Sequence, residues 1–483
     1  MRAASRAAAA LGVLVAFHLF CLATIAGLLA VDAVALNRGP LFALTLILVV
    51  PVVTLLTAGL VVLASDTGPE RTGVAIGRAE QDGLWALVDR VAAQLGARVP
   101  DELRLVPGTA LTLGERGPIC GLLPGRQTLH IGLAELAGLG SAELAAVVAG
   151  QLGRFGGRQA RLAGATYRTS QSVRRGIDRL SRQRVLARTI AIPLAWLARR
   201  YDRLAGPVCR DRERATERIA AHLTGPDAAT RALAAGPALG QVWAQLVDRH
   251  LDPGRRSGFL PRRPVAGFLA VQADLARTEE SVPVRTARRA TALLREPDTA
   301  FLAVLADWAA GPGEPVLLEW PDFAHAAMRA ELLRTVTPLL DSAAALTGAT
   351  GTPQQVLDLL AADRLTELGA PFAGTAPGAG PRARRELARS AVRRQLGGLA
   401  LVLLTDIGAA RWPLSWAPPA ELVVDQPFHD WLAPLLDSAV ADGGDLVGLR
   451  TLLEEAGARL SVRPTARESA TPVRKGPHPH GIR

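Results

Sequence analysis

The chain has 483 residues and a formal net charge of +11, from 55 Lys and Arg against 44 Asp and Glu. Apolar residues make up 49% of it, which excludes a disordered chain, because this composition can bury a core. Its three cysteines include no Cys-x-x-Cys pair, so a disulfide framework and a cysteine zinc site are both excluded. Nucleic acid is not an expected partner, since aromatic residues are scarce and are not interleaved with the arginines.

Two apolar segments near the N-terminus predict membrane spans. Residues 7–31 and 40–64 contain no Asp, Glu, Lys or Arg, and each exceeds the ~20 residues that cross a bilayer. Because only a short link separates them, we expect residues 1–65 to form a two-helix transmembrane hairpin, with the lipid bilayer as a partner.

The arginines around this hairpin predict its orientation. Arg2 and Arg6 precede the first span and Arg71 and Arg78 follow the second, whereas the link carries only Arg38. The positive-inside rule places both ends, and the large C-terminal part, in the cytoplasm of a multi-pass protein of the cell membrane. A signal-peptide cleavage site at 33–35 is the alternative, although the apolar run is long for a signal peptide.

The hydropathy pattern beyond the hairpin predicts a helix followed by two strands and a second helix. Apolar residues at helical spacing indicate a helix over 80–95, and alternation indicates strands over 102–106 and 127–132. Ser141 is placed to cap a helix that begins at Ala142. A loop or short hairpin with several glycines connects the two strands.

Helices dominate the rest of the chain. An arginine-rich helical region is expected over 168–207, and a helix over 208–223 that stops at Thr224-Gly225-Pro226. The main domain is expected over 66–300. Further predicted segments are a helical extension over 301–369, a Pro/Gly linker over 370–382, a helical region over 383–461 and a disordered tail over 462–483.

Five segments, taken in this order, carry a family resemblance. In sequence letters they are VPDELRLV at 99–106, GRQTLHIGL at 125–133, AELAAVVA at 142–149, TYRT at 166–169 and RERATERIAAHLTG at 212–225. With the paired spans before them, they make the chain resemble the HtpX-like family of membrane zinc metallopeptidases. The resemblance is dense over about 86–225 and faint beyond 300.

The resemblance implies a fold and an activity. The fold is mainly α with a small β-sheet, an α+β gluzincin-like metallopeptidase domain behind the N-terminal two-helix hairpin. The family's cofactor is zinc and its activity is that of a membrane-bound metalloendopeptidase.

The chain departs from the family at the catalytic helix. The family carries HExxH directly after the stretch matched by 142–149, with two zinc-binding His and a Glu as general base. Here Gly150 and Arg154 stand at the His positions and Gln151 stands at the base position. Glycine has no ligating atom, arginine is permanently charged, and glutamine cannot take up a proton. We therefore expect no bound zinc and no catalytic residue.

One family ligand is left, and it predicts an ion pair. Glu213 matches the third zinc ligand on the later helix, in a Glu-x-x-Thr-Glu pattern where the family has Glu-x-x-Ala-Asp. The alternative is that Glu213 and Glu217 are an exposed i, i+4 pair. In the family interpretation a buried carboxylate without its metal needs a partner, so Arg154 and Glu213 are expected to pair. His130 and His222 are not placed to replace the missing ligands.

These residues leave two functions of different class. The first is a non-catalytic pseudopeptidase that binds peptide or protein segments or regulates an active relative. The predicted strand with Gln127, Leu129 and Ile131 would be the edge on which an extended peptide docks. The second is an active zinc metalloendopeptidase with non-standard ligands, which Gly150 and Arg154 argue against. A membrane protein that uses only its hairpin and helices is a third option.

Overall fold

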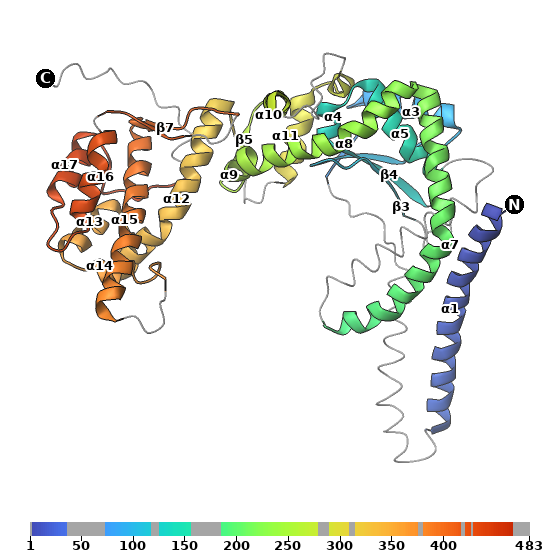
Figure 1. The fold of residues 1–483 in the computed structure, drawn as a ribbon, viewed down its shortest axis with the longest axis horizontal. Coiled ribbons are helices and arrows are strands. Elements are labelled where there is room, and N and C mark those ends of the chain that lie inside the picture. Colours follow the sequence, from blue (N-terminus) through green and yellow to red (C-terminus); the bar gives the residue numbers. More distant parts are fainter. Residues whose placement is uncertain are drawn as a thin grey trace. The chain divides into compact units, whose positions relative to one another are not determined.

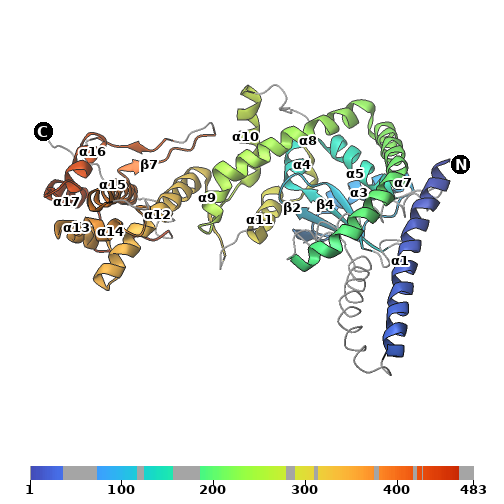
Figure 2. The same ribbon diagram turned by 60° about the horizontal axis from the view of Figure 1, so that its bottom comes forward.

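The computed structural model describes residues 2–35, 73–116, 125–155, 185–278, 289–308, 314–374, 380–416, 421–426 and 428–466. It divides into two compact units, one of 1–241 with 280–300 and one of 242–279 with 301–483. Figures 1 and 2 show that helices make up most of the ribbon, with small sheets. The predicted fold class, mainly α with a small β-sheet, is confirmed at this level.

The first unit contains a four-stranded sheet. Its strands are β1 (Val74–Ile76), β2 (Glu102–Val106), β3 (Thr112–Arg116) and β4 (Arg126–Gly132), in the order β1-β2-β4-β3. β4 runs parallel to β2 and antiparallel to β3. Two of the four strands, β2 and β4, were predicted. Leu103 and Leu105 alternate along β2, and Leu129 and Ile131 alternate along β4, and all four are buried.

Short helices surround this sheet. They are α3 (Asp82–Leu95), α4 (Leu133–Gly138), α5 (Ser141–Phe155) and the 3₁₀ turn η2 (Ala290–Leu293). α3 forms where predicted, because its apolar residues recur on one face, and it ends at Gly96, whose φ of 56° is left-handed. The buried residues of α3 are Leu84, Trp85, Leu87, Val88, Val91 and Ala92.

Two long helices complete the first unit. α1 covers Arg2–Ala35 and α7 covers Val185–Thr224 as one continuous helix. α7 ends at Gly225, which has a φ of 88°, as the Thr-Gly-Pro sequence predicts. α1 carries exposed apolar side chains at Val15, Leu19 and Phe20.

Within the described residues, no helix is both long enough and apolar enough to cross a membrane. The predicted span 7–31 falls on α1, of whose side chains the structure describes only a part, and the span 40–64 lies outside the described residues. The transmembrane hairpin therefore stays a prediction.

The second unit is a helical bundle with two small β-pairs. α8 (Pro226–Leu246) and α11 (Pro297–Trp308) each contribute residues to both units. β5 pairs with β6 in parallel, and β7 pairs with β8 in antiparallel. In chain order its other elements are η1 (Val247–Leu251), α9 (Asp252–Arg255), β5 (Phe259–Pro261), α10 (Pro264–Thr278), β6 (Val316–Leu318), α12 (Trp320–Thr347), α13 (Pro353–Ala361), α14 (Leu365–Gly369), α15 (Pro381–Asp406), β7 (Ala410–Arg411), β8 (Val423–Val424), α16 (Phe428–Ala439) and α17 (Val447–Glu455).

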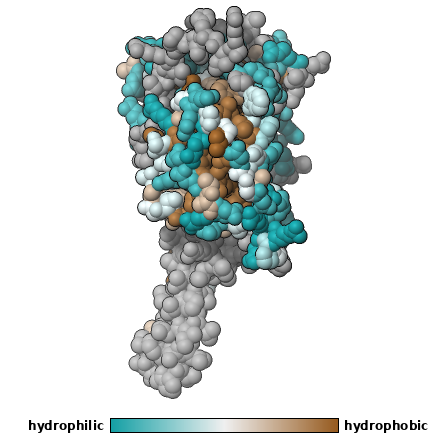
Figure 3. Space-filling model, turned by 90° about the vertical axis from the view of Figure 1, so that its left-hand side faces the viewer, coloured by the Kyte–Doolittle hydropathy of each residue, from teal (hydrophilic) through white to brown (hydrophobic). Residues whose placement is uncertain are grey.

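The unit boundaries differ from the predicted domains. The predicted linker 370–382 lies inside the second unit, between α14 and α15, and these two helices pack together through Gly369, Ala388 and Val392. Residues 242–279 belong to the second unit and not to the main domain. On the face of this unit turned to the viewer in Figure 3, apolar residues form a stripe bordered by hydrophilic ones.

Candidate functional site

Glu143 stabilises the start of α5, the helix that carries residues 150–154, where the resemblance predicts HExxH. Glu143 is 2% exposed, and its carboxylate accepts from Gly140 N at 2.9 Å and from Arg231 Nε at 3.1 Å. This carboxylate caps the first turn of the helix, where backbone N–H groups lack partners within the helix. Ser141 Oγ donates to Arg289 O at 3.5 Å instead of capping the helix.

α5 packs against α7 through two small residues. A Cβ added to Gly153 would lie 2.5 Å from Thr216 Cγ2, so the two helices approach closely at this point. Thr216 itself is 3% exposed, and the buried residues of α7 recur every three or four positions. They are Tyr201, Ala205, Val208, Thr216 and Ala220.

The structure brings the helices of the predicted site residues together. Gly150, Gln151 and Arg154 are partly buried on α5, and Glu213 is partly buried on α7, one turn before Thr216. No described atom lies within 4 Å of the place where a Gly150 Cβ would stand. Gly150 is thus not required by close packing, unlike Gly153.

The predicted ion pair between Arg154 and Glu213 is not formed among the described residues. Arg154 Nη1 donates instead to Gln151 Oε1 at 3.3 Å, one turn back on its own helix. Gly153 and Thr216 form a close contact between the two helices. Arg154 is rotated away from this contact by about 100° around α5.

The donor set at these positions does not fit zinc. A catalytic zinc site needs three protein ligands, and here one carboxylate stands beside a glycine, an amide and a guanidinium. In the part of the chain that the structure describes, no three His, Cys, Asp or Glu side chains are grouped so as to hold a metal ion.

The predicted docking edge needs a correction. β4, with Gln127, Leu129 and Ile131, is an inner strand, because β2 pairs with one side of it and β3 with the other. Leu129 and Ile131 are fully buried. The physical reason is that residues 112–116 fold back onto β4, so β3 is the strand at this end of the sheet.

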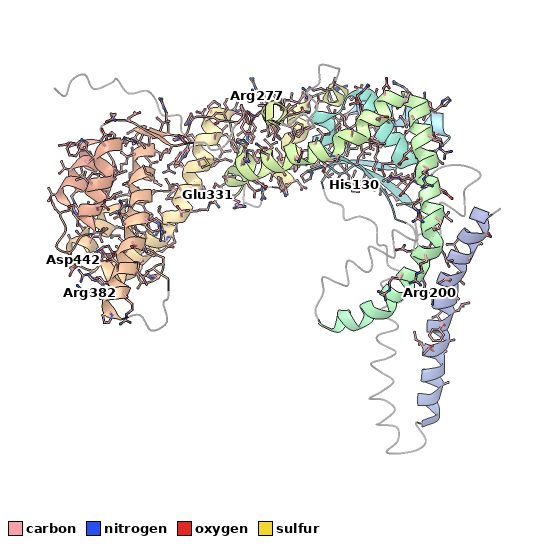
Figure 4. The ribbon with its side chains drawn as sticks, viewed as in Figure 1. His130, Arg200, Arg277, Glu331, Arg382 and Asp442 are labelled. Carbon is pink, nitrogen blue, oxygen red and sulfur yellow. The ribbon has the colours of Figure 1, made fainter. Side chains whose placement is uncertain are left out.

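His130 is buried in the sheet and is not part of the α5–α7 contact. It is 4% exposed on β4, where it is paired in register with Arg104 of β2 and Thr112 of β3. Figure 4 labels His130 at the sheet and Arg200 on α7.

A buried carboxyl group that sequence analysis missed lies on α4. Glu135 is 8% exposed, and its burial raises the pKa to about 7, with the backbone N–H groups of Glu135 and Ala110 opposing the shift in part. The signal in the sequence was a single acidic residue within the otherwise apolar and small run 133–139.

No protein-family model, no curated protein and no solved structure matches this chain. The resemblance to the HtpX-like family therefore rests on the residues quoted above, and the function has to be argued from the site.

Proposed function

We propose that this chain is a membrane-anchored homologue of the HtpX-like metallopeptidases that has lost its zinc site and acts without catalysis, as a peptide- or protein-binding or regulatory pseudopeptidase. The observation that carries the proposal is the identity of three positions on α5. Gly150, Gln151 and Arg154 replace both imidazoles and the base on the helix that packs against the helix of Glu213.

The chemistry of these replacements opposes hydrolysis of a peptide bond. Without two imidazoles no metal is held to lower the pKa of a water molecule, and Gln151 cannot accept its proton. The open space at Gly150 supports the idea of a vacated position, because a glycine selected for packing would have a neighbour in contact.

The outer edge of β3 is the surface that we assign to an extended peptide. β3 stands at the end of the sheet, and in the described part of the chain no strand pairs with its outer side. Such an edge offers backbone N–H and C=O groups to an added strand. Along this strand Thr112 is exposed, whereas Leu113, Gly114 and Glu115 are buried, so only the start of β3 is accessible.

Anchoring in the membrane is supported by α1. Val15, Leu19, Phe20 and Leu22 are between 46% and 67% exposed, and exposed apolar side chains on one helix are stabilised by a lipid environment.

Rebuilding the zinc site tests the proposal. The full chain, purified in detergent, would be compared with the variant Gly150→His/Gln151→Glu/Arg154→His, and zinc per chain would be measured by elemental analysis after dialysis. We expect nearly no zinc in the natural chain and about one zinc in the variant. A Glu213→Gln change in the rebuilt background should remove that zinc.

Two outcomes would overturn the proposal. About one zinc in the natural chain, lost on Glu213→Gln, would show an active-type site with non-standard ligands. A rebuilt variant that keeps its helical circular dichroism and binds no zinc would show that α5 and α7 are not the family's ligand helices.

A further inference from the structure

Glu135 is a buried acid with an unmatched oxygen. It lies in the first turn of α4, more than nine-tenths buried, and its Oε2 makes no hydrogen bond within the described residues. A buried polar atom in this state is costly, and most such atoms in proteins are paired. The unpaired oxygen of Glu135 therefore suggests a role for this carboxyl group.

Two backbone groups of the loop 107–111 lie near this oxygen. The point where a Gly132 Cβ would stand lies 2.2 Å from Glu135 Oε2, 2.3 Å from Gly108 O and 2.6 Å from Ala110 N. Glu135 Oε2 and the Gly108 carbonyl oxygen, two acceptors, thus lie close to the same point beside Gly132, and the N–H groups of Glu135 and Ala110 bond to the carboxyl group. A carboxylate has acceptors only and is repelled by the carbonyl, whereas a neutral carboxyl group can match both.

No charge compensates an ionised Glu135 among the described residues. Arg231 of α8 pairs with Glu143, and Arg289, next to η2, donates to Ala137 O near the other end of α4. His130 on β4 adds no charge interaction to Glu135. Burial therefore dominates and raises the pKa of Glu135 to about 7.

We propose that Glu135 is a proton-operated latch on the loop 107–111. The neutral carboxyl group holds the Gly108 carbonyl and the start of α4 together, and loss of the proton releases the loop. Ala134 N already donates to Gly108 O at 3.2 Å, so the latch adds a second tie to an existing contact. The loop leads directly into β3, and control of peptide docking by this latch rests on the proposed function, whereas the latch itself does not.

Hydrogen exchange measures the latch directly. The full chain in detergent would be labelled at pH 6 and pH 8, with rates corrected for the intrinsic pH dependence of exchange. We expect the protection of amides 108–116 to fall about tenfold, because a group with a pKa of about 7 goes from mostly neutral to mostly ionised. Since this pKa lies above the ordinary 4.5, the stabilisation is complete below about pH 4.5 and is lost as the pH rises through 7.

The variant Glu135→Gln fixes the latch closed, since an amide donates and accepts at every pH. Its protection over 108–116 should not change between pH 6 and pH 8. The control Glu80→Gln replaces an exposed carboxylate that accepts from Gly77 N in the same unit, and it should keep the natural pH dependence.

A natural chain whose 108–116 protection is the same at both pH values would overturn the latch, even if Glu135→Gln fails to fold. So would a folded Glu135→Gln variant that retains the natural pH dependence. Neither result bears on zinc binding, so failure of the latch and failure of the proposed function are separate outcomes.

Discussion

Helices approach one another closely at glycine residues in both units. In the first unit Gly153 of α5 meets Thr216 of α7, and in the second Gly398 of α15 meets Val336 of α12, with an added Cβ 2.6 Å from Val336 Cγ1. Both contacts need a residue without a side chain. The two crossings differ in what surrounds them.

The α12–α15 crossing has close neighbours beside it. The neighbouring Gly397 would place a Cβ 3.2 Å from Leu436, and Arg329 of α12, at 1% exposed, donates to Asp406 Oδ1 at 2.5 Å. At the α5–α7 crossing no described atom lies within 4 Å of a Gly150 Cβ, and Arg154 Nη1 donates to Gln151 of its own helix.

This difference separates glycines kept for packing from a glycine that packing does not explain. Gly153 and Gly398 each prevent a clash, and the helix crossing is the reason for them. Gly150 prevents none, although glycine in a helix costs about 1 kcal/mol against alanine. A helical glycine with no described packing neighbour agrees with the proposal that this position has lost a ligand.

The largest expected effect comes from the ion pair that only the second crossing has. Arg329→Ala leaves Asp406 and the Thr465 carbonyl without their donor, and we expect the free energy of unfolding to fall by about 3 kcal/mol. Urea unfolding of the full chain measures it. The control Arg393→Ala removes an exposed pair with Asp437 and should cost much less, because solvent screens an exposed pair. Equal losses would show that the buried pair does not stabilise this crossing.

A smaller effect is expected at the glycine contact of the first crossing. Gly153→Val forces a side chain against Thr216 Cγ2, and such overpacking costs about 2 kcal/mol. Thr216→Ser removes that methyl group and keeps the hydroxyl, so the double variant should recover part of the loss. Additive losses, measured by the same unfolding titration, would mean that the two residues do not touch.

The sequence predicts those parts of the fold whose own pattern is strong. β2 and β4 alternate cleanly, and α3 has a continuous apolar face, so all three were found. β1 has three residues, and β3 reads Thr-Leu-Gly-Glu-Arg, which has no clear alternation. Because β3 was not predicted from the sequence, β4 was predicted to be an edge strand.

The unit boundary had no signal because it falls inside α8, between residues 241 and 242. A helix that continues across a boundary shows no break in its pattern. The Pro/Gly run at 370–382 attracted the prediction of a linker, yet it connects two helices of one unit.

At the site, the sequence identifies residue types but not the directions of side chains. The replacement of the ligand positions is evident from Gly150, Gln151 and Arg154 themselves. Whether Arg154 reaches Glu213 depends on its rotation around α5, which spacing alone does not fix. The burial of Glu135 depends on the loop 107–111, which lies 24 to 28 residues earlier in the chain, and no local pattern shows it.

The smallest expected effect is a change in stability when a glycine is replaced by alanine, and its sign should differ between Gly150 and Gly398. Gly150→Ala adds a Cβ where no described atom lies within 4 Å, and alanine favours the helix by about 1 kcal/mol, so we expect the variant to be more stable by about that amount. Gly398→Ala, the matched control, should be less stable, because its Cβ would lie 2.6 Å from Val336 Cγ1. Thermal unfolding of both variants beside the natural chain measures the difference. A loss of stability in Gly150→Ala would show that something packs against this position, and Gly150 would then have the same explanation as Gly153.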